Sequence, residues 1–326
     1  MLVILNCIRG LESFEEGARS PSAQTLRDRL NLTGEWLEYY HCSVWKLAIL
    51  MVKKFQRFHW WISIDETYVP FFGDRKKLNK KLKKNCGKSY VHGYRADTAG
   101  ATGSFCFLVI SLCCCKIRIP IAIKLIAVNE GYEPWLKPHL HRLLKLVHSP
   151  VVLADRGFGK AVWFYAMLDD LGARYVVRMP LRKKEHKNKV AAGITKFQHW
   201  MKDSSNHNKV LLTIHVARDE NNREYILASN IDKKTPKELL QMYLHRWDLE
   251  NIFKDSDRIQ LPTSSPNPQM RLFCVVVAFF LFTLWQVKPL FHKASLRHFV
   301  KRAIEILCTL LQCIITPFGV IIHQTS

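Results

Sequence analysis

Apolar residues recur with two different periods along the chain. Ile62 and Ile64 alternate with Trp61, Ser63 and Asp65, and a period of two predicts a strand. Residues 104–115 and 116–128 are almost continuously apolar and rich in β-branched side chains. Runs of this kind predict two strands that are buried on both faces and joined by a tight connection.

The pattern then changes to an alternation of helices and strands. Residues 134–147 and 160–171 carry apolar side chains at helical spacing, whereas 151–155 and 174–179 are short strand-like runs. The expected order is β-β-β-α-β-α-β. We therefore predict an α/β fold in which helices flank a mixed sheet.

Residues 180–235 differ from this alternation in composition and in hydrophobic pattern. They begin with a basic stretch and contain two strand runs, 210–217 and 224–230, on either side of a turn-like segment. A helix is expected to begin at Thr235, a capping residue followed by proline, and to continue through Glu250. Pro262 forbids its extension.

These patterns divide the chain into four regions. Residues 1–58 are expected to be helical, with a basic helix at 20–30 that either enters a DNA groove or is a solvated surface helix. The other expected regions are a sheet domain formed by 59–180 and 236–290, a β-rich insertion at 181–235, and a basic and apolar tail at 291–326.

The apolar run at residues 272–287 has no charged side chain, and Arg271 and Lys288 bracket it. It is shorter than the roughly 20 residues that a spanning helix needs. We predict a buried core helix and no membrane; the alternative is a membrane anchor.

Charge points to the partner. The 326 residues include 49 Lys and Arg against 27 Asp and Glu, a net charge of +22. Such an excess favours a polyanion, because cations on phosphates release counterions; the alternative is a basic protein adapted to its solvent. Residues 74–95 are predicted to be a basic loop that either grips a nucleic-acid strand or is solvated and mobile.

The ten cysteines form no C-x-x-C pair and no zinc-like spacing, and without a secretory signal they predict a reduced, cytoplasmic protein.

Candidate chemistry lies in three carboxylates. Asp65 and Asp155 end strand-like runs, and a helical segment places Tyr243, Arg246, Glu250 and Lys254 on one face. A strand-end Asp is often a turn former, and a helical Glu near Arg is often an exposed ion pair. The large aromatic rings around this helix favour a functional site; they are those of Tyr243, Trp247 and Phe253.

Four motifs together carry a resemblance to a known family. They are Ile64-Asp65-Glu-Thr, Leu153-Ala-Asp155-Arg-Gly-Phe, Tyr-Val-Val-Arg178 and Tyr243-x-x-Arg246-Trp-Asp-Leu-Glu250. Over residues 60–290 the chain resembles the DDE transposases of prokaryotic insertion sequences with the Tyr-Arg-Glu-Lys signature. The resemblance implies a ribonuclease H-like domain with a β-rich insertion before the last catalytic helix.

The resemblance also implies roles for residues. Asp65, Asp155 and Glu250 would be catalytic and would bind two Mg²⁺ or Mn²⁺ ions. Water would attack the phosphodiester at the element end, and the freed 3′-hydroxyl would attack the second strand or the target. The residues implied to contact DNA are Tyr243, Arg246, Lys254, Arg258 and Arg156. The implied partner is double-stranded DNA bound by a homodimer in a prokaryotic nucleoid.

One position departs from the signature. Its lysine is expected seven positions after Glu250, where this chain has Asp257. Lys254 or Arg258 would substitute for it, or end binding would be impaired. The short segment before the first strand suggests a shortened copy. Two alternatives therefore stay open, a catalytically impaired DNA-binding relative and another ribonuclease H-like nuclease.

Overall fold

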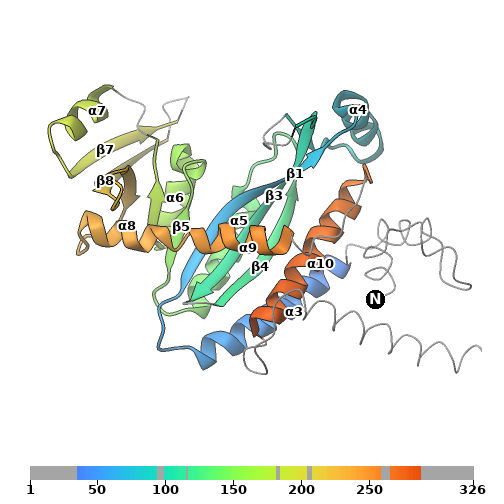
Figure 1. The fold of residues 1–326 in the computed structure, drawn as a ribbon, viewed down its shortest axis with the longest axis horizontal. Coiled ribbons are helices and arrows are strands. Elements are labelled where there is room, and N and C mark those ends of the chain that lie inside the picture. Colours follow the sequence, from blue (N-terminus) through green and yellow to red (C-terminus); the bar gives the residue numbers. More distant parts are fainter. Residues whose placement is uncertain are drawn as a thin grey trace, which may run out of the picture.

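A nine-stranded mixed sheet forms the centre of the part of the chain described by the computed structural model, residues 35–93, 99–114, 117–180, 184–203, 208–257 and 265–287 (Figure 1). Three long strands come first: β1 (Trp61–Phe71), β3 (Gly103–Cys114) and β4 (Ile117–Ile126). β3 pairs antiparallel with β1 on one edge and with β4 on the other. The two predicted apolar strands are thus confirmed, and every residue of β3 is buried.

Two short parallel strands continue the sheet beside β1. They are β5 (Val151–Ala154) and β6 (Arg174–Arg178). Helices α5 (Glu133–Leu146) and α6 (Val162–Asp170), with a 3-10 turn η1 (Phe158–Lys160), fill the connections. The order β4-β3-β1-β5-β6 confirms the predicted mixed α/β sheet and is consistent with a ribonuclease H-like fold.

The predicted hairpin strands extend this same sheet. β9 (Glu224–Ser229) pairs antiparallel with β6, and β8 (Lys209–Arg218) and β7 (Lys196–Lys202) follow in order. Helix α7 (Lys184–Ala191) and strand β7 were not expected from the sequence. At the other edge, the two-residue β2 (Val91–His92) pairs with the start of β3.

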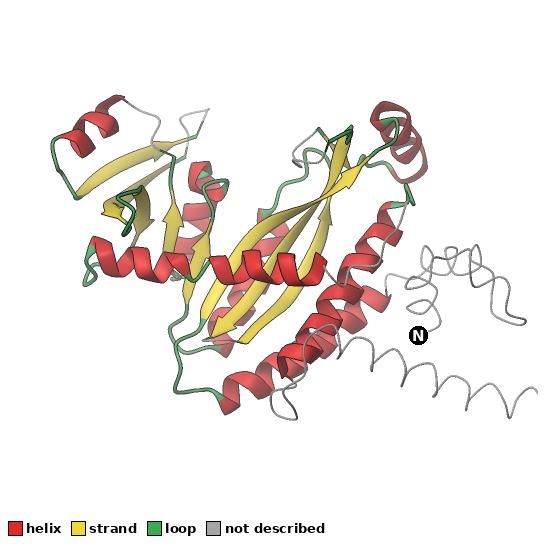
Figure 2. Ribbon diagram, viewed as in Figure 1, coloured by secondary structure: helices red, strands yellow, loops and turns green. Residues whose placement is uncertain are grey.

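Helices cover both faces of the sheet (Figure 2). Alternation along β5 sends Val151 and Leu153 to one face, where α8 (Pro236–Leu244) packs on them. Val152 and Ala154 point to the opposite face, in the main core with α5 and α6. The two faces of β5 are therefore both closed, which explains its uninterrupted apolar sequence.

The apolar run near the end of the described chain forms α10 (Pro268–Val287), which packs against β4, α3 (Glu35–Lys54) and α9 (Trp247–Asp257). By length and composition α10 could cross a membrane, but 78% of its most apolar window is buried inside the fold. This packing supports the predicted core helix.

Two local predictions are wrong. The expected basic loop contains helix α4 (Arg75–Cys86), because Asp74 caps its first turn and Gly87 ends it in the left-handed conformation with φ of 72°. The expected continuous helix from Thr235 is interrupted at His245 and Arg246, which form a turn between α8 and α9. The basic helix expected at residues 20–30, the tail at 291–326 and Arg258 lie outside the described residues.

Candidate active site

The first two carboxylates become neighbours through strand pairing. β1 and β5 run parallel with Ile64 opposite Ala154, so Asp65 and Asp155 follow at the same level. Both share the face of Ser63 and Leu153, which is the face covered by α8 and α9. Glu66 points to the other face, where it accepts a hydrogen bond from the Tyr68 hydroxyl.

The turn after Asp155 is fixed by close packing. The backbone carbonyl of Asp155 accepts hydrogen bonds from the amides of Phe158 and Gly159, at 3.0 and 3.2 Å. Phe158 is buried, and a Cβ built on Gly159 would overlap the carbonyl oxygen of Arg178 on β6. Gly159 therefore lets this turn approach β6, a role that the sequence motif around Asp155 does not by itself predict.

The third carboxylate arrives on the helices that cross the sheet. α8 and α9 lie end to end across its front (Figure 1), and the turn between them carries Arg246. Thr235 starts α8 with a reciprocal capping box to Glu238. Tyr243 at the end of α8 is fully buried, and Glu250 lies one turn into α9.

Arg246 joins these parts into one network. Its Nη1 donates to Asp65 Oδ2 at 2.7 Å, and its Nη2 donates to Glu250 Oε1 at 2.6 Å. Its Nε donates to the Tyr243 hydroxyl at 3.0 Å. The Arg246 side chain is only 6% exposed, so the exposed ion-pair ladder considered for this helix is not what forms.

Burial sets the protonation of Asp65. Removal from water raises its pKa to about 7, despite the opposing attraction of Arg246 and with smaller increases from the negative charges of Asp155 and Glu250. Burial likewise raises the pKa of Tyr243. Asp65 therefore interacts electrostatically with both Asp155 and Glu250.

The other predicted residues lie farther out. Arg156 is exposed beside Asp155, and its amide donates to the Asp155 carboxylate. Lys254 is exposed on α9 and forms no ion pair with a described carboxylate. Asp257 ends α9, but its side chain is outside the described part.

The donor chemistry of the site suits a divalent cation. Carboxylate oxygens are the ligands that Mg²⁺ prefers, and Asp65 would gain from a nearby positive charge. Across the described residues, however, no three His, Cys, Asp or Glu side chains are grouped as ligands of one ion. The guanidinium of Arg246 bridges Asp65 and Glu250 in this arrangement.

Comparison with known proteins identifies the family. Residues 56–261 match the family model described as a transposase DDE domain. The chain belongs to this DDE transposase family. No match was found among curated proteins.

A solved structure is also similar to this DDE chain. It is the piggyBac transposase synaptic complex with hairpin DNA, with 13% sequence identity and a TM-score of 0.49. The alignment covers 74% of this chain and 51% of that chain, so the match spans about half the length of the solved protein.

Membership of the family bears on the cofactor, because DDE transposases generally use divalent metal ions.

Proposed function

We propose that this protein is a DNA transposase that cleaves DNA at the ends of its element and transfers the strand to a target. The observation that carries the proposal is that Asp65 of β1 and Glu250 of α9 share one buried arginine, while strand pairing places Asp155, after β5, level with Asp65. Membership of the DDE transposase family supports the same reaction class.

The carboxylates supply the metal ligands in this proposal. Asp65, Asp155 and Glu250 would hold two Mg²⁺ ions, or Mn²⁺, which supply positive charge at the reacting phosphate and lower the pKa of attacking water. The burial of Asp65 limits competing water at its carboxylate. Because Arg246 is hydrogen-bonded to Asp65 and Glu250, metal binding would compete with the guanidinium for the oxygen atoms of these two carboxylates.

Arg246 and Tyr243 are proposed to contact the phosphate of the element end. A guanidinium released from one carboxylate can present two N–H groups to a phosphate. The hydrogen bond from Arg246 Nε to the Tyr243 hydroxyl would hold the guanidinium in position. Its Nη1 and Nη2 atoms could then exchange a carboxylate for a phosphate as hydrogen-bond acceptor. Arg156 and Lys254, both exposed beside the site, would add further phosphate contacts, and Arg258 follows α9 in sequence.

The finer assignment is an insertion-sequence transposase of prokaryotic type with the Tyr-Arg-Glu-Lys signature. The spacing of Tyr243, Arg246 and Glu250 supports it. It implies a cytoplasmic, nucleoid-associated protein that acts on double-stranded DNA as a homodimer. We also propose the four-region division given above, with residues 181–235 as the β-rich insertion.

A second candidate function is a DNA-binding relative with impaired catalysis. Asp257 favours it, because an acid stands where the signature has a lysine. The complete set of Asp65, Asp155 and Glu250 favours the active enzyme.

Single substitutions test the proposal. Asp65→Asn, Asp155→Asn and Glu250→Gln should each lower Mg²⁺-dependent cleavage of element-end DNA by at least about a thousandfold, since each removes a charged ligand. DNA affinity should change much less. Asp169→Asn, on the opposite side of the sheet in α6, is the matched control. Full cleavage by any site variant would remove that residue from the mechanism, and an inactive wild-type chain that still binds DNA would favour the impaired relative.

A further inference from the structure

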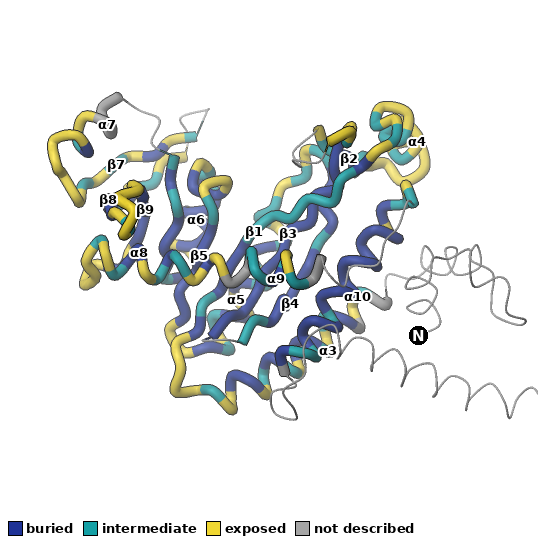
Figure 3. The backbone as a smooth tube through the Cα atoms, in the orientation of Figure 1, coloured by how far each residue is buried: buried dark blue, intermediate teal, exposed yellow. Residues whose placement is uncertain are grey.

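Helix α4 concentrates positive charge at the far end of β1. Its sequence has no acidic residue, and its exposed lysines are Lys76, Lys77, Lys80, Lys81, Lys83 and Lys84. Figure 3 shows the helix as mostly exposed. Within the described ranges none of these lysines forms an ion pair, although Lys88 just beyond the helix pairs with Glu130 at 3.4 Å.

The fold holds this helix in place against its own repulsion. Like charges three and four positions apart destabilise a helix, and α4 has no fully buried residue to compensate. Polar anchors are used instead: Asn79 donates to the Val91 carbonyl at 2.7 Å and accepts from the amides of Tyr90 and Val91. Gly103 on β3 allows the close approach of β2 and Arg75, because a Cβ there would meet the His92 carbonyl oxygen at 2.6 Å and the Arg75 side chain at 2.9 Å.

A groove runs beside α4 toward the start of α10. Lys77, Lys81 and Arg271 supply its cations, and burial lowers the pKa of Arg271. Phe72 also lines it, with 58% of its surface exposed, and Asp74 is its one acidic lining residue. Cations next to an exposed aromatic ring form the combination that binds nucleic-acid strands through phosphates and stacking.

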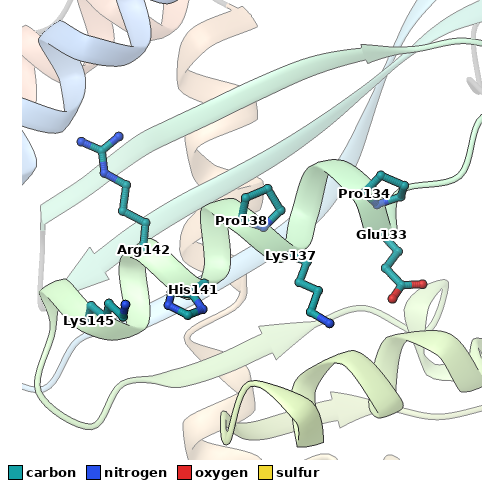
Figure 4. A pocket seen from close by; sticks show the side chains of 7 residues that line it. All are labelled: Glu133, Pro134, Lys137, Pro138, His141, Arg142 and Lys145. Atoms are coloured by element: carbon teal, nitrogen blue, oxygen red, sulfur yellow. The ribbon is translucent and has the colours of Figure 1, made fainter.

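A second hollow offers a contrast. It follows α5, with Glu133 at the start of the helix and Lys137, His141, Arg142 and Lys145 farther along it (Figure 4). Lys137 pairs with Asp170 at 2.5 Å. The α5 hollow therefore has mixed charge, with part of it already neutralised. Two further cations there, Arg142 and Lys145, form no ion pair within the described residues, against six such lysines on α4.

We propose that α4 and its groove form a DNA-backbone clamp, separate from the carboxylate site, in which the α4 lysines contact phosphates and Phe72 packs on a sugar or base. Phe71 lies six positions after Asp65 along β1, about 20 Å of strand. At about 3.4 Å per nucleotide, the clamp holds DNA roughly six nucleotides from the reacting phosphate. This inference rests on the proposed function, because it takes DNA as the partner.

Two matched triple variants of the full chain test the clamp. Lys77→Gln, Lys80→Gln and Lys81→Gln remove three charges from α4 and leave its caps and Asn79 intact. The control removes three exposed charges elsewhere, through Lys145→Gln, Lys233→Gln and Lys237→Gln. Both variants lower the net charge equally, so general attraction to DNA changes equally.

The measurement is the dissociation constant for a 40-base-pair duplex over a series of salt concentrations. The α4 triple should weaken binding at least about tenfold and reduce the slope of log affinity against log salt by about 3, whereas the control should change the slope by less than about 1. Phe72→Ala should weaken binding severalfold with the slope unchanged, because it removes no charge.

The outcomes separate the two proposals. A wild-type chain that does not bind the duplex overturns the proposed function and the clamp with it. Tight wild-type binding with equal losses in the two triples overturns the clamp alone. A drop confined to the α4 triple supports it, and normal binding by Phe72→Ala would exclude the ring from the contact. Circular dichroism of each variant shows whether the fold is kept.

Discussion

The carboxylate site and α4 hold charge in opposite ways. In the site, a nearly buried arginine is bonded to two carboxylates brought from distant parts of the chain. In α4, exposed lysines from one continuous segment find no acidic partner among the described residues. Buried charge must be paired because its removal from water costs free energy. Exposed charge is screened by water and stays accessible to a binding partner such as DNA. The first region should therefore govern stability, and the second should govern binding.

The largest stability effect should come from the buried cation. Arg246→Ala leaves Asp65 and Glu250 without their shared partner and should lower the free energy of unfolding by about 3–5 kcal/mol. The matched control is Arg218→Ala, which breaks the exposed pair with Glu224 at 2.7 Å and should cost less than about 1 kcal/mol. Urea unfolding of both variants measures the difference. Similar losses in the two would show that burial does not distinguish the regions.

A pH-dependent effect should follow from Asp65. Its pKa is raised to about 7 in the folded chain, so folding takes up a proton between about pH 4 and pH 7. The stability associated with protonated Asp65 is present below about pH 4 and is lost as the pH rises through 7. Asp65→Asn cannot ionise, so its stability relative to wild type should rise by up to about 4 kcal/mol from pH 4 to pH 8.

Thermal unfolding at both pH values, without metal, checks this prediction. A constant difference between Asp65→Asn and wild type would mean that Asp65 does not titrate in this window. Adding Mg²⁺ at pH 8 should then stabilise the wild type more than the variant, because a bound cation removes the cost of ionising Asp65. Equal stabilisation would argue against Asp65 as a ligand.

The backbone contact behind Asp155 should have a smaller effect. Gly159→Ala places a methyl group against the Arg178 carbonyl and should destabilise the fold by about 1–3 kcal/mol. It should also lower cleavage, since Gly159 donates to the Asp155 carbonyl. Gly157→Ala is the control, because nothing lies within 4 Å of its added Cβ and its φ of −57° suits alanine. If the Gly159→Ala variant keeps the stability and cleavage activity of the wild type, the turn is not closely packed against the Arg178 carbonyl.

The candidate site residues that belong to family motifs could be predicted from the sequence. Asp65, Asp155, Glu250, Arg246 and Tyr243 could be proposed together, and the order of strands and helices along the chain followed from the apolar patterns. What the sequence could not show is which groups contact which. The bridge from Arg246 to Asp65 joins residues far apart in the chain, and the approach of Gly159 to Arg178 depends on how the turn η1 packs against strand β6.

The wrong predictions share a physical cause. Lysine-rich α4 has two leucines as its only apolar side chains apart from Cys86, too few to predict a helix, and its caps, the Asn79 hydrogen bonds and the packing of Leu78 against the core stabilise it. The segment from Thr235 to Asp257 has continuous helical periodicity, yet two turn residues interrupt it at His245 and Arg246. Tertiary contacts thus formed one helix and broke another, which local propensity alone does not reveal.

The smallest effect should appear in α4 itself. Lys80 lies three or four positions from Lys76, Lys77, Lys83 and Lys84, so Lys80→Glu replaces four repulsions with attractions worth about 0.2–0.5 kcal/mol each. Amide hydrogen exchange within α4 should slow severalfold, while exchange in β3 stays unchanged. Lys80→Gln, which removes repulsion without adding attraction, should give a smaller slowing. Faster exchange in Lys80→Glu would mean that the lysines stabilise α4 through contacts other than charge, and the contrast with the paired charges of the carboxylate site would then fail.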